Sequence, residues 1–308
     1  MGGARRVAVV TGASGGIGRA VALRLAEAGM AVVANDYGVT VDGREPSAGP
    51  ITELVEQITE AGGTAVAHHG SVADFGTGKE LISTAVDQFG GLDLLVTCHG
   101  ILRERMIFNM SEEEWDAVIS VHLKGTFNCV RFATERMRAQ RHGSIVLITS
   151  AAGLEGNPAQ ANYSAAKLGI VGLGYSTALA MGKYGVNVNC ISPVAATRMT
   201  DRLTGAMART QRPSERGDAA LIAELTLALA DLRHITGQVY TASDSKLARW
   251  TNPTQVCEVT PDEGWTAADV RFALEHQLGL QPLRRFAALG LATPGPARRP
   301  ESKVDCPS

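Results

Sequence analysis

The stretch VAVVTGASGGIG, residues 7–18, decides the fold. It opens with a short apolar, β-branched run, and its glycine-rich turn leads into a helical pattern from Arg19 to Ala28. Such a turn lets backbone N–H groups and the helix N-terminus approach a pyrophosphate, while the last glycine allows the helix to pack closely on the strand. We therefore predict a dinucleotide site here, with contacts from Gly12, Ser14, Gly16, Ile17 and Gly18.

The residue after the second predicted strand bears on the choice of nucleotide. That strand runs from Ala31 to Asn35, and Asp36 follows it. A dinucleotide fold places an acid near this point to bind the adenosine ribose hydroxyls, although an ordinary loop acid is the alternative. A carboxylate would repel a ribose phosphate, and no basic residue precedes Gly16 in the turn, so we expect NAD in preference to NADP. The Gly- and Pro-rich insertion over residues 37–50 is interpreted as a loop beside the adenosine.

Strand and helix patterns alternate along most of the chain. Further strands are predicted near residues 64–68, 92–96, 143–150, 186–190 and 238–241, separated by helical patterns. This alternation predicts a parallel sheet covered by helices on both faces. The predicted fold class is α/β, with a single Rossmann-type, doubly wound, seven-stranded parallel sheet over residues 1–241 and a C-terminal extension over residues 242–308.

Two segments fall outside the alternation. Residues 194–216 are irregular and too long for an ordinary connection, which favours a substrate lid over the alternative of a disordered linker. In the extension, Thr266 to Asp269 carry a helix start signal for a helix that runs to about Leu278. The last residues, 293–308, are rich in Pro and charge, and we predict a disordered tail.

A hydroxyl, a phenol and an ammonium group can converge near the fifth strand. Ser150 follows that strand, and Lys167 lies four residues after Tyr163, a spacing that puts both side chains on one face of a helix. A tyrosine with a pKa near 10 is a poor acid-base catalyst at neutral pH, and a neighbouring ammonium lowers that pKa. We expect these three residues to form a proton-transfer group.

Composition excludes several classes of function. The 308 residues are 45% hydrophobic, and 29 basic against 31 acidic side chains give a formal charge of -2. The net charge therefore does not favour binding to nucleic acid or to an anionic membrane surface. No stretch approaches the roughly 20 consecutive apolar residues that are needed to cross a bilayer. Five cysteines lack metal-ligand spacing, so we predict no metal site and interpret them as reduced thiols of a cytoplasmic protein.

The chain resembles the short-chain dehydrogenase/reductase family over about residues 5–241. The motifs that carry this resemblance are TGASGGIG from Thr11 to Gly18, the spacing of Ser150, Tyr163 and Lys167, and Pro193 with Thr197. The resemblance implies an NAD(P)-dependent oxidoreductase in which the Ser holds the substrate oxygen, the Tyr exchanges the proton, and the Lys lowers the Tyr pKa and holds the nicotinamide ribose. It also implies cofactor contacts from Ser71, Val72, Cys98, Gly100, Tyr163, Lys167, Pro193 and Thr197.

A closer similarity is to the (3R)-hydroxyacyl-CoA dehydrogenase region of the peroxisomal multifunctional enzyme type 2 and to bacterial hydroxysteroid dehydrogenases built like it. The shared motifs include GILR at 100–103, VHLKG at 121–125 and QANY at 160–163. In most relatives an Asn that relays protons stands where His122 does, and His is shared with the multifunctional enzyme. The similarity implies that His122 is a fourth catalytic residue, and that a homodimer or homotetramer forms through the Tyr163 helix.

One departure from the family pattern affects the turn after the fourth strand. The usual Asn-Asn-Ala-Gly is Thr97-Cys98-His99-Gly100 here, which removes a side chain that steadies the sheet and implies an imidazole close to the cofactor ribose.

The function expected first is an NAD(H)-dependent dehydrogenase for a secondary alcohol or ketone in a bulky hydrophobic substrate, such as a CoA thioester or a steroid. The alternatives are a polyketide-type ketoreductase and a cofactor-binding scaffold that no longer turns over.

Overall fold

The computed structural model describes residues 5–194, 219–243, 246–255, 257–260 and 265–278. The chain divides into two compact units, Met1–Trp250 and Thr251–Ser308. The predicted lid over residues 194–216, including Thr197, lies almost wholly outside the described residues, as does the predicted tail over residues 293–308.

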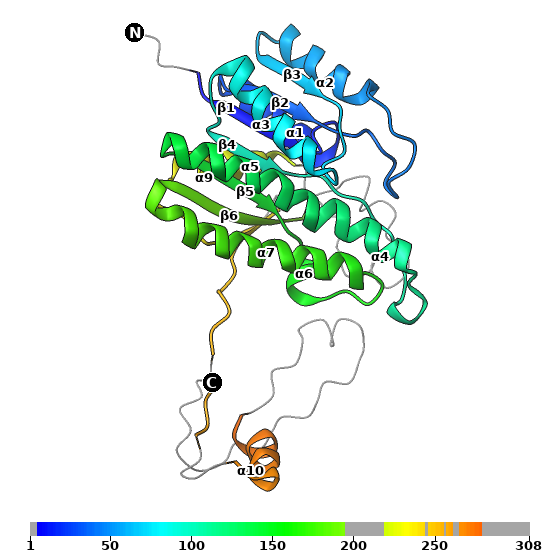
Figure 1. Ribbon diagram of the computed structural model, residues 1–308, viewed down its shortest axis with the longest axis vertical. Helices are drawn as coiled ribbons and strands as arrows, with labels where there is room; N and C mark the ends of the chain where they lie inside the picture. Colours follow the sequence, from blue (N-terminus) through cyan, green and yellow to red (C-terminus); the bar gives the residue numbers. More distant parts are fainter. Residues whose placement is uncertain (1–4, 195–218, 244–245, 256, 261–264, 279–308) are drawn as a thin grey trace. The chain divides into compact units, whose positions relative to one another are not determined.

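The first unit is built on one sheet with the strand order β3-β2-β1-β4-β5-β6-β7-β8 (Figure 1). Neighbouring strands from β1 to β7 pair in parallel, and β8 pairs antiparallel with β7. The strands are β1 Val7–Thr11, β2 Ala31–Asn35, β3 Thr64–His68, β4 Leu94–Thr97, β5 Gly143–Ile148, β6 Val186–Pro193, β7 Val239–Ser243 and β8 Lys246–Arg249.

The predicted α/β fold with seven parallel strands is confirmed, and the sheet has an eighth strand that the sequence did not indicate. β8 lies in the segment that was assigned to the extension. Its four residues include Lys246 and Arg249, and most of them are exposed. A short, charged edge strand has no buried face, so it carries no alternation of apolar and polar residues that could be read from the sequence.

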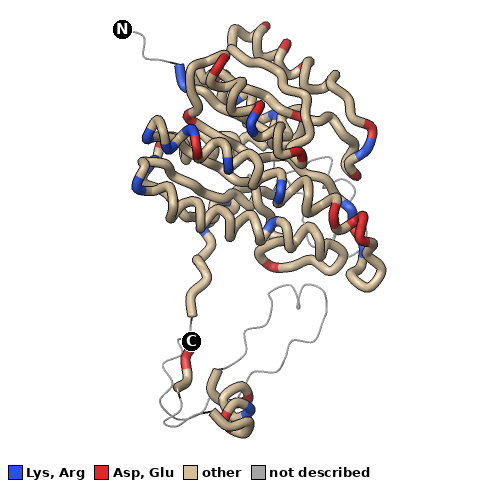
Figure 2. The backbone as a smooth tube through the Cα atoms, in the orientation of Figure 1, with Lys and Arg blue, Asp and Glu red and all other residues tan. Residues whose placement is uncertain are grey.

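Helices cover both faces of the sheet. The α-helices of the first unit are α1 Gly16–Glu27, α2 Gly49–Glu60, α3 Phe75–Phe89, α4 Glu112–Ile119, α5 Gly125–Gln140, α6 Ala151–Glu155, α7 Ala161–Met181 and α9 Ala220–Asp231. The second unit contains α10, Ala267–Phe272. Successive strand residues point to opposite faces, so Ala8 and Val10 pack with α1, α2 and α9, while Val7 and Val9 pack with α3, α5 and α7. Figure 2 shows that charge gathers on helices and loops, because β1 to β7 contain no Lys, Arg, Asp or Glu.

Two helices, α4 and α5, follow the fourth strand and are joined by a π-helical turn. A capping box of Ser111 and Glu114 starts α4. Between α4 and α5, Ser120–Lys124 form a π-helical turn that carries His122. In the second unit Thr266 caps α10 as predicted, and a further π turn spans Ala273–Gln277. A π turn inside a helix frequently marks a functional position.

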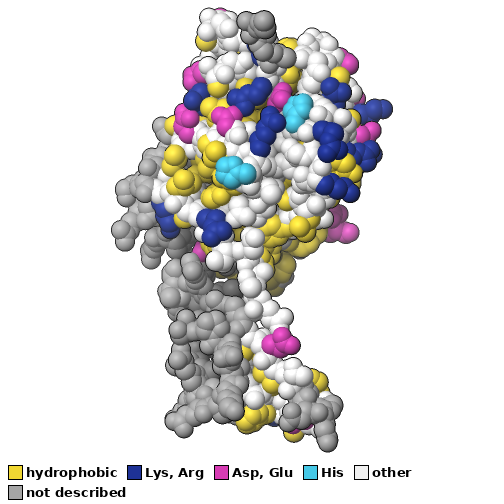
Figure 3. All heavy atoms as spheres, turned by 90° about the vertical axis from the view of Figure 1, so that its left-hand side faces the viewer, with side chains coloured by type: hydrophobic (Ala, Val, Ile, Leu, Met, Phe, Trp, Pro, Cys, Tyr) yellow, Lys and Arg dark blue, Asp and Glu magenta, His cyan; other side chains and the backbone are white. Residues whose placement is uncertain are grey.

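Surface and cysteine chemistry add two observations. Basic and acidic side chains both lie on the face of the molecule shown in Figure 3, in keeping with the formal charge of -2. Within the described residues, no helix has the length and apolar character that crossing a bilayer requires.

Cys98, Cys129 and Cys190 are free thiols, but Cys257 is disulfide-bonded, so the prediction of five reduced thiols is wrong for that residue.

Candidate active site

The structure brings Ser150, Tyr163 and Lys167 together beyond the carboxyl end of β5. Ser150 caps α6, and its Oγ accepts a hydrogen bond of 3.1 Å from the N–H of Ala152. Tyr163 and Lys167 lie one turn apart on α7, with Nζ of the lysine 5.6 Å from the centroid of the phenol ring. The Ser150 side chain is a hydrogen-bond partner of Tyr163. Ligands bind at this edge of a doubly wound sheet.

Burial works against ionisation of both the phenol and the amine. It raises the pKa of Tyr163, the hydrogen bond from Ser150 opposes that rise, and the charge of Glu104 adds to it. Burial also lowers the pKa of Lys167 from 10.5 to about 8, with Cys98 and Cys190 acting in the opposite direction. The Nζ donates a hydrogen bond of 2.8 Å to the carbonyl oxygen of Ile148. That Lys167 lowers the pKa of Tyr163 therefore stays a prediction.

His122 lies at the same point, which the sequence spacing alone could not show. Its ring stands edge-on to Tyr163, with centroids 5.0 Å apart and planes at 88°. Nε2 lies 3.0 Å from the backbone nitrogen and 2.8 Å from the carbonyl oxygen of Ile101, and Nδ1 is buried without a partner. Burial and the charge of Lys167 lower the pKa of His122 well below its ordinary value, so the ring is neutral. A Cβ on Gly100 would lie 2.3 Å from the ring, so this neighbour has to be glycine.

The glycine turn leaves a backbone cradle that side chains would fill. Gly12 has φ +64°, and a Cβ there would lie 2.6 Å from the backbone nitrogen of His99. A Cβ on Gly18 would lie 2.0 Å from the carbonyl oxygen of Gly12. Gly16, also at positive φ, begins α1, and Ile17 packs against the core beside it. This tight backbone at a helix N-terminus fits the pyrophosphate of a dinucleotide.

Asp36 reaches back to the glycine turn. Its Oδ2 accepts hydrogen bonds from the N–H and the hydroxyl of Ser14, at 2.9 and 2.6 Å, and its Oδ1 accepts one of 2.7 Å from the N–H of Gly38. The carboxylate thus stands beside the predicted pyrophosphate cradle, at the end of β2. That Asp36 binds the adenosine ribose hydroxyls stays a prediction.

The remaining predicted cofactor contacts lie in the loops after β3 and β4 and at the end of β6. The carbonyl of Ser71 accepts a hydrogen bond from Asp74, and that of Val72 accepts one of 2.8 Å from the buried Asn128 side chain. Cys98 follows β4, where burial raises the pKa of its thiol to about 12. Pro193 is the last residue of β6.

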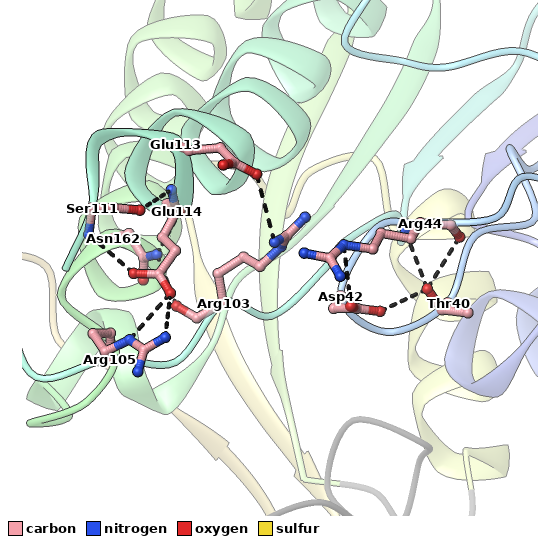
Figure 4. Close-up of polar contacts among 9 residues, drawn as sticks. All are labelled: Thr40, Asp42, Arg44, Arg103, Arg105, Ser111, Glu113, Glu114 and Asn162. Atoms are coloured by element: carbon pink, nitrogen blue, oxygen red, sulfur yellow. Dashed lines mark hydrogen bonds and ion pairs between the residues drawn. The ribbon is translucent and has the colours of Figure 1, made fainter.

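Asn162 is a site residue whose role the spacing of the catalytic residues did not reveal. It is fully buried, and its Nδ2 donates to the carbonyls of Arg103, at 3.0 Å, and Glu114, at 2.9 Å (Figure 4). Its Oδ1 accepts a hydrogen bond of 2.7 Å from the N–H of Tyr163. One amide therefore ties the start of α7 to α4 and to the loop after β4. Asn162 stood inside the recognised QANY motif, but no spacing rule assigns such a link.

The insertion over residues 37–50, predicted to lie beside the adenosine, contacts the loop after β4. The N–H of Leu102 donates a hydrogen bond of 2.8 Å to the carbonyl of Val41, and Val39 packs in the apolar cluster that includes Ile101 and Tyr163. On the right of Figure 4, Thr40 holds the loop closed through Asp42 and Arg44. The insertion therefore joins the wall of the proton-transfer site.

Comparisons with known proteins agree with this geometry. A family profile described as short chain dehydrogenase matches residues 6–208. The putative short-chain type dehydrogenase/reductase Rv0148 of Mycobacterium tuberculosis is 47% identical over 195 residues, 63% of this chain and 68% of that protein. The hydroxyacyl-CoA dehydrogenase ChsB1 of the same organism is 46% identical over 209 residues, 65% of this chain and 64% of that protein.

A longer relative and a solved structure add to these matches. The mouse peroxisomal multifunctional enzyme type 2 is 44% identical over 196 residues, which are 64% of this chain but 26% of that protein. The chain therefore spans about a quarter of that relative. A crystal structure of a short chain dehydrogenase from Mycobacterium avium superposes with a TM-score of 0.76 at 39% identity, covering 98% of this chain and all of that one.

Proposed function

This chain belongs to the short-chain dehydrogenase family, and on that premise we propose that it is an NAD(H)-dependent oxidoreductase that interconverts a secondary alcohol and a ketone in a 3-hydroxyacyl-CoA-type substrate. Membership of the family makes it an NAD(P)-dependent enzyme, and the nucleotide and the substrate are the proposed part. The observation that carries the proposal is the convergence of Tyr163 with Ser150, Lys167 and His122 beside the glycine turn.

The chain's own residues handle the substrate oxygen and its proton. The Ser150 hydroxyl holds the substrate oxygen against Tyr163, which takes the alcohol proton during oxidation and returns it during reduction. Lys167, with a pKa of about 8, can exchange a proton with the phenol near neutral pH. When the nicotinamide cofactor is bound, it accepts or supplies the hydride, so both electrons and the proton are accounted for.

The proposed preference for NAD rests on Asp36. Its carboxylate, bound to Ser14 and Gly38, would bind ribose hydroxyls and repel a ribose phosphate. Asp36→Asn keeps the size and removes the charge, so we expect the ratio of kcat/KM with NAD to that with NADP to fall about tenfold or more. Asp42→Asn, in the neighbouring insertion, is the matched control. An unchanged ratio in Asp36→Asn would show that Asp36 does not read the ribose.

Two observations support the substrate class and the assembly. Relatives at 44–46% identity are named a hydroxyacyl-CoA dehydrogenase and a peroxisomal multifunctional enzyme. On α7, Leu168 and Leu179 are 54% and 87% exposed, which suits a helix that packs against a second copy in a homodimer or homotetramer. Light scattering of Leu179→Glu should show a smaller assembly than the wild type.

Turnover of 3-ketoacyl-CoA with NADH tests the function directly. Tyr163→Phe should lower kcat at least about 100-fold and leave the Kd for NADH within about threefold, because the phenol acts on the proton. Tyr175→Phe, half-buried further along α7, is the matched control and should stay near wild type. Retained turnover in Tyr163→Phe contradicts the assignment. A wild type that reduces ketosteroids or polyketide-like ketones instead would favour those substrates, and no turnover at all would favour a scaffold.

A further inference from the structure

The unusual residue His99 has a buried position between the two halves of the site. It follows β4, whose neighbour β1 leads into the glycine turn, and Thr97 of β4 is in register with Thr11 of β1. His99 is 8% exposed, and its backbone lies so close to Gly12 that no Cβ fits between them. The resemblance implied an imidazole close to the cofactor ribose, whereas the ring is held in the core between two threonines.

The contacts of the imidazole join two elements that are far apart in the sequence. Nδ1 lies 2.7 Å from Oγ1 of Thr11, the residue before the glycine turn. Nε2 lies 3.3 Å from Oγ1 of Thr126, in the first turn of α5. Both hydroxyls are buried. A Cβ on Gly125 would lie 3.2 Å from Nε2, so a glycine in the helix makes room for the ring.

The imidazole also acts on the π turn itself. The backbone of the π turn lies beside the His99 ring, where the carbonyls of Val121 and His122 act to raise the pKa of the imidazole. A π turn loosens the regular i→i−4 ladder, and an inserted side chain can take up the backbone groups that it displaces. The ring of His122, carried by this turn, stands edge-on to Tyr163.

A single protonation state suits these contacts. Burial and the charge of Lys167 lower the pKa of His99 to about 3, so the ring is neutral and has one donor and one acceptor. We assign the proton to Nε2, which faces the Thr126 hydroxyl, so that Nδ1 accepts from the Thr11 hydroxyl. Both nitrogens of the His99 ring then have a partner, as most buried polar groups do.

We propose that His99 is a positioning residue that couples the glycine turn to the π turn, and so sets His122 and Tyr163 relative to the bound nucleotide. It touches neither the substrate nor the reacting atoms. The proposal rests on the function proposed above for its kinetic consequence, but the link from Thr11 through His99 to Thr126, two residues after the π turn, stands on the contacts alone.

Three variants separate this role from a merely structural one. His99→Ala removes the link, His99→Gln keeps an acceptor for Thr11 and a donor for the π turn, and Thr126→Val removes one partner on the helix side. His142→Ala, just before the amino end of β5, is the matched control. We expect His99→Ala to lower kcat with 3-ketoacyl-CoA about tenfold or more, and His99→Gln to recover it to within about threefold. His142→Ala should match the wild type.

A second measurement does not depend on turnover. In protein with nitrogen-labelled histidine, NADH should shift the His122 imidazole resonance of the wild type and of His99→Gln. In His99→Ala the shift should be lost although NADH still binds, and in Thr126→Val it should shrink while the Kd for NADH stays unchanged. The proposal is overturned if NADH shifts the His122 resonance of His99→Ala as much as that of the wild type. It is also overturned if the shift is lost equally in His99→Ala and His99→Gln. If the wild type reduces no ketone, the proposed function fails and the resonance still decides the role of His99.

Discussion

Replacing Lys167 by methionine should abolish turnover and yet make the fold more stable. Lys167 is 3% exposed, and burial lowers its pKa from 10.5 to about 8. Each pKa unit corresponds to about 1.4 kcal/mol, so carrying this ammonium in the folded state costs roughly 3 kcal/mol at neutral pH. Methionine has a similar length, fills irregular core space and carries no charge.

The lost hydrogen bond reduces the expected gain. Nζ donates to the carbonyl of Ile148 at 2.8 Å, and removing such a bond costs about 1 to 2 kcal/mol. We therefore expect Lys167→Met to raise the free energy of unfolding by about 1 to 2 kcal/mol at pH 7, measured by urea unfolding. Lys124→Met, which changes an exposed lysine, should alter it by less than about 0.5 kcal/mol.

The pH dependence gives the sharper test. Below pH 8 the lysine is protonated in both states, so the destabilisation is fully present. As the pH rises from 8 towards 10.5 the folded state loses this proton first, and the wild type gains stability relative to Lys167→Met. Burial also raises the pKa of Cys98 and Cys190 to about 12, and because this burial is common to both proteins, most of the contribution of the thiols cancels in the difference. A variant less stable than the wild type at pH 7, with a parallel pH profile, would refute this reasoning.

Two further predictions concern the cradle and the phenol. Gly18→Ala places a Cβ 2.0 Å from the carbonyl oxygen of Gly12, so we expect the Kd for NADH to rise at least about tenfold and the Tm to fall. Gly172→Ala, where nothing lies within 4 Å, should instead stabilise α7 by roughly 0.5 to 1 kcal/mol. Glu104→Gln removes a charge that raises the pKa of Tyr163, so the pH profile of alcohol oxidation should move to lower pH; an unmoved profile would show that this charge does not reach the phenol.

The sequence predicted the features that depend on local pattern. The apolar strands and the glycine turn lie where they were expected, because alternation and turn chemistry are written in adjacent residues. The capping boxes at Ser111 and Thr266 are present for the same reason. The spacing of Tyr163 and Lys167 placed them on one helix face, although their site roles stay predictions.

Long-range contacts could not be predicted in this way. His122 and His99 each meet partners more than 20 positions away, and the shift from α-helical to π-helical bonding that aims His122 leaves no residue signature. Asn162 likewise links three segments through a single amide. Each of these contacts forms because buried polar groups need hydrogen-bond partners, and the partners that are available depend on which segments of the chain the fold brings together.

The ionisations of Tyr163 and Lys167 are coupled, because the charge on each group stabilises the charge on the other. Burial opposes charge on each group alone, at a cost of roughly 3 kcal/mol for the lysine. With 5.6 Å between Nζ and the ring centroid, attraction between a phenolate and an ammonium at an effective dielectric constant near 20 is about 3 kcal/mol. The attraction offsets the cost, so the ammonium is stabilised when the phenolate forms. The pair therefore titrates as a unit, and Lys167→Met should raise the pKa of Tyr163 further.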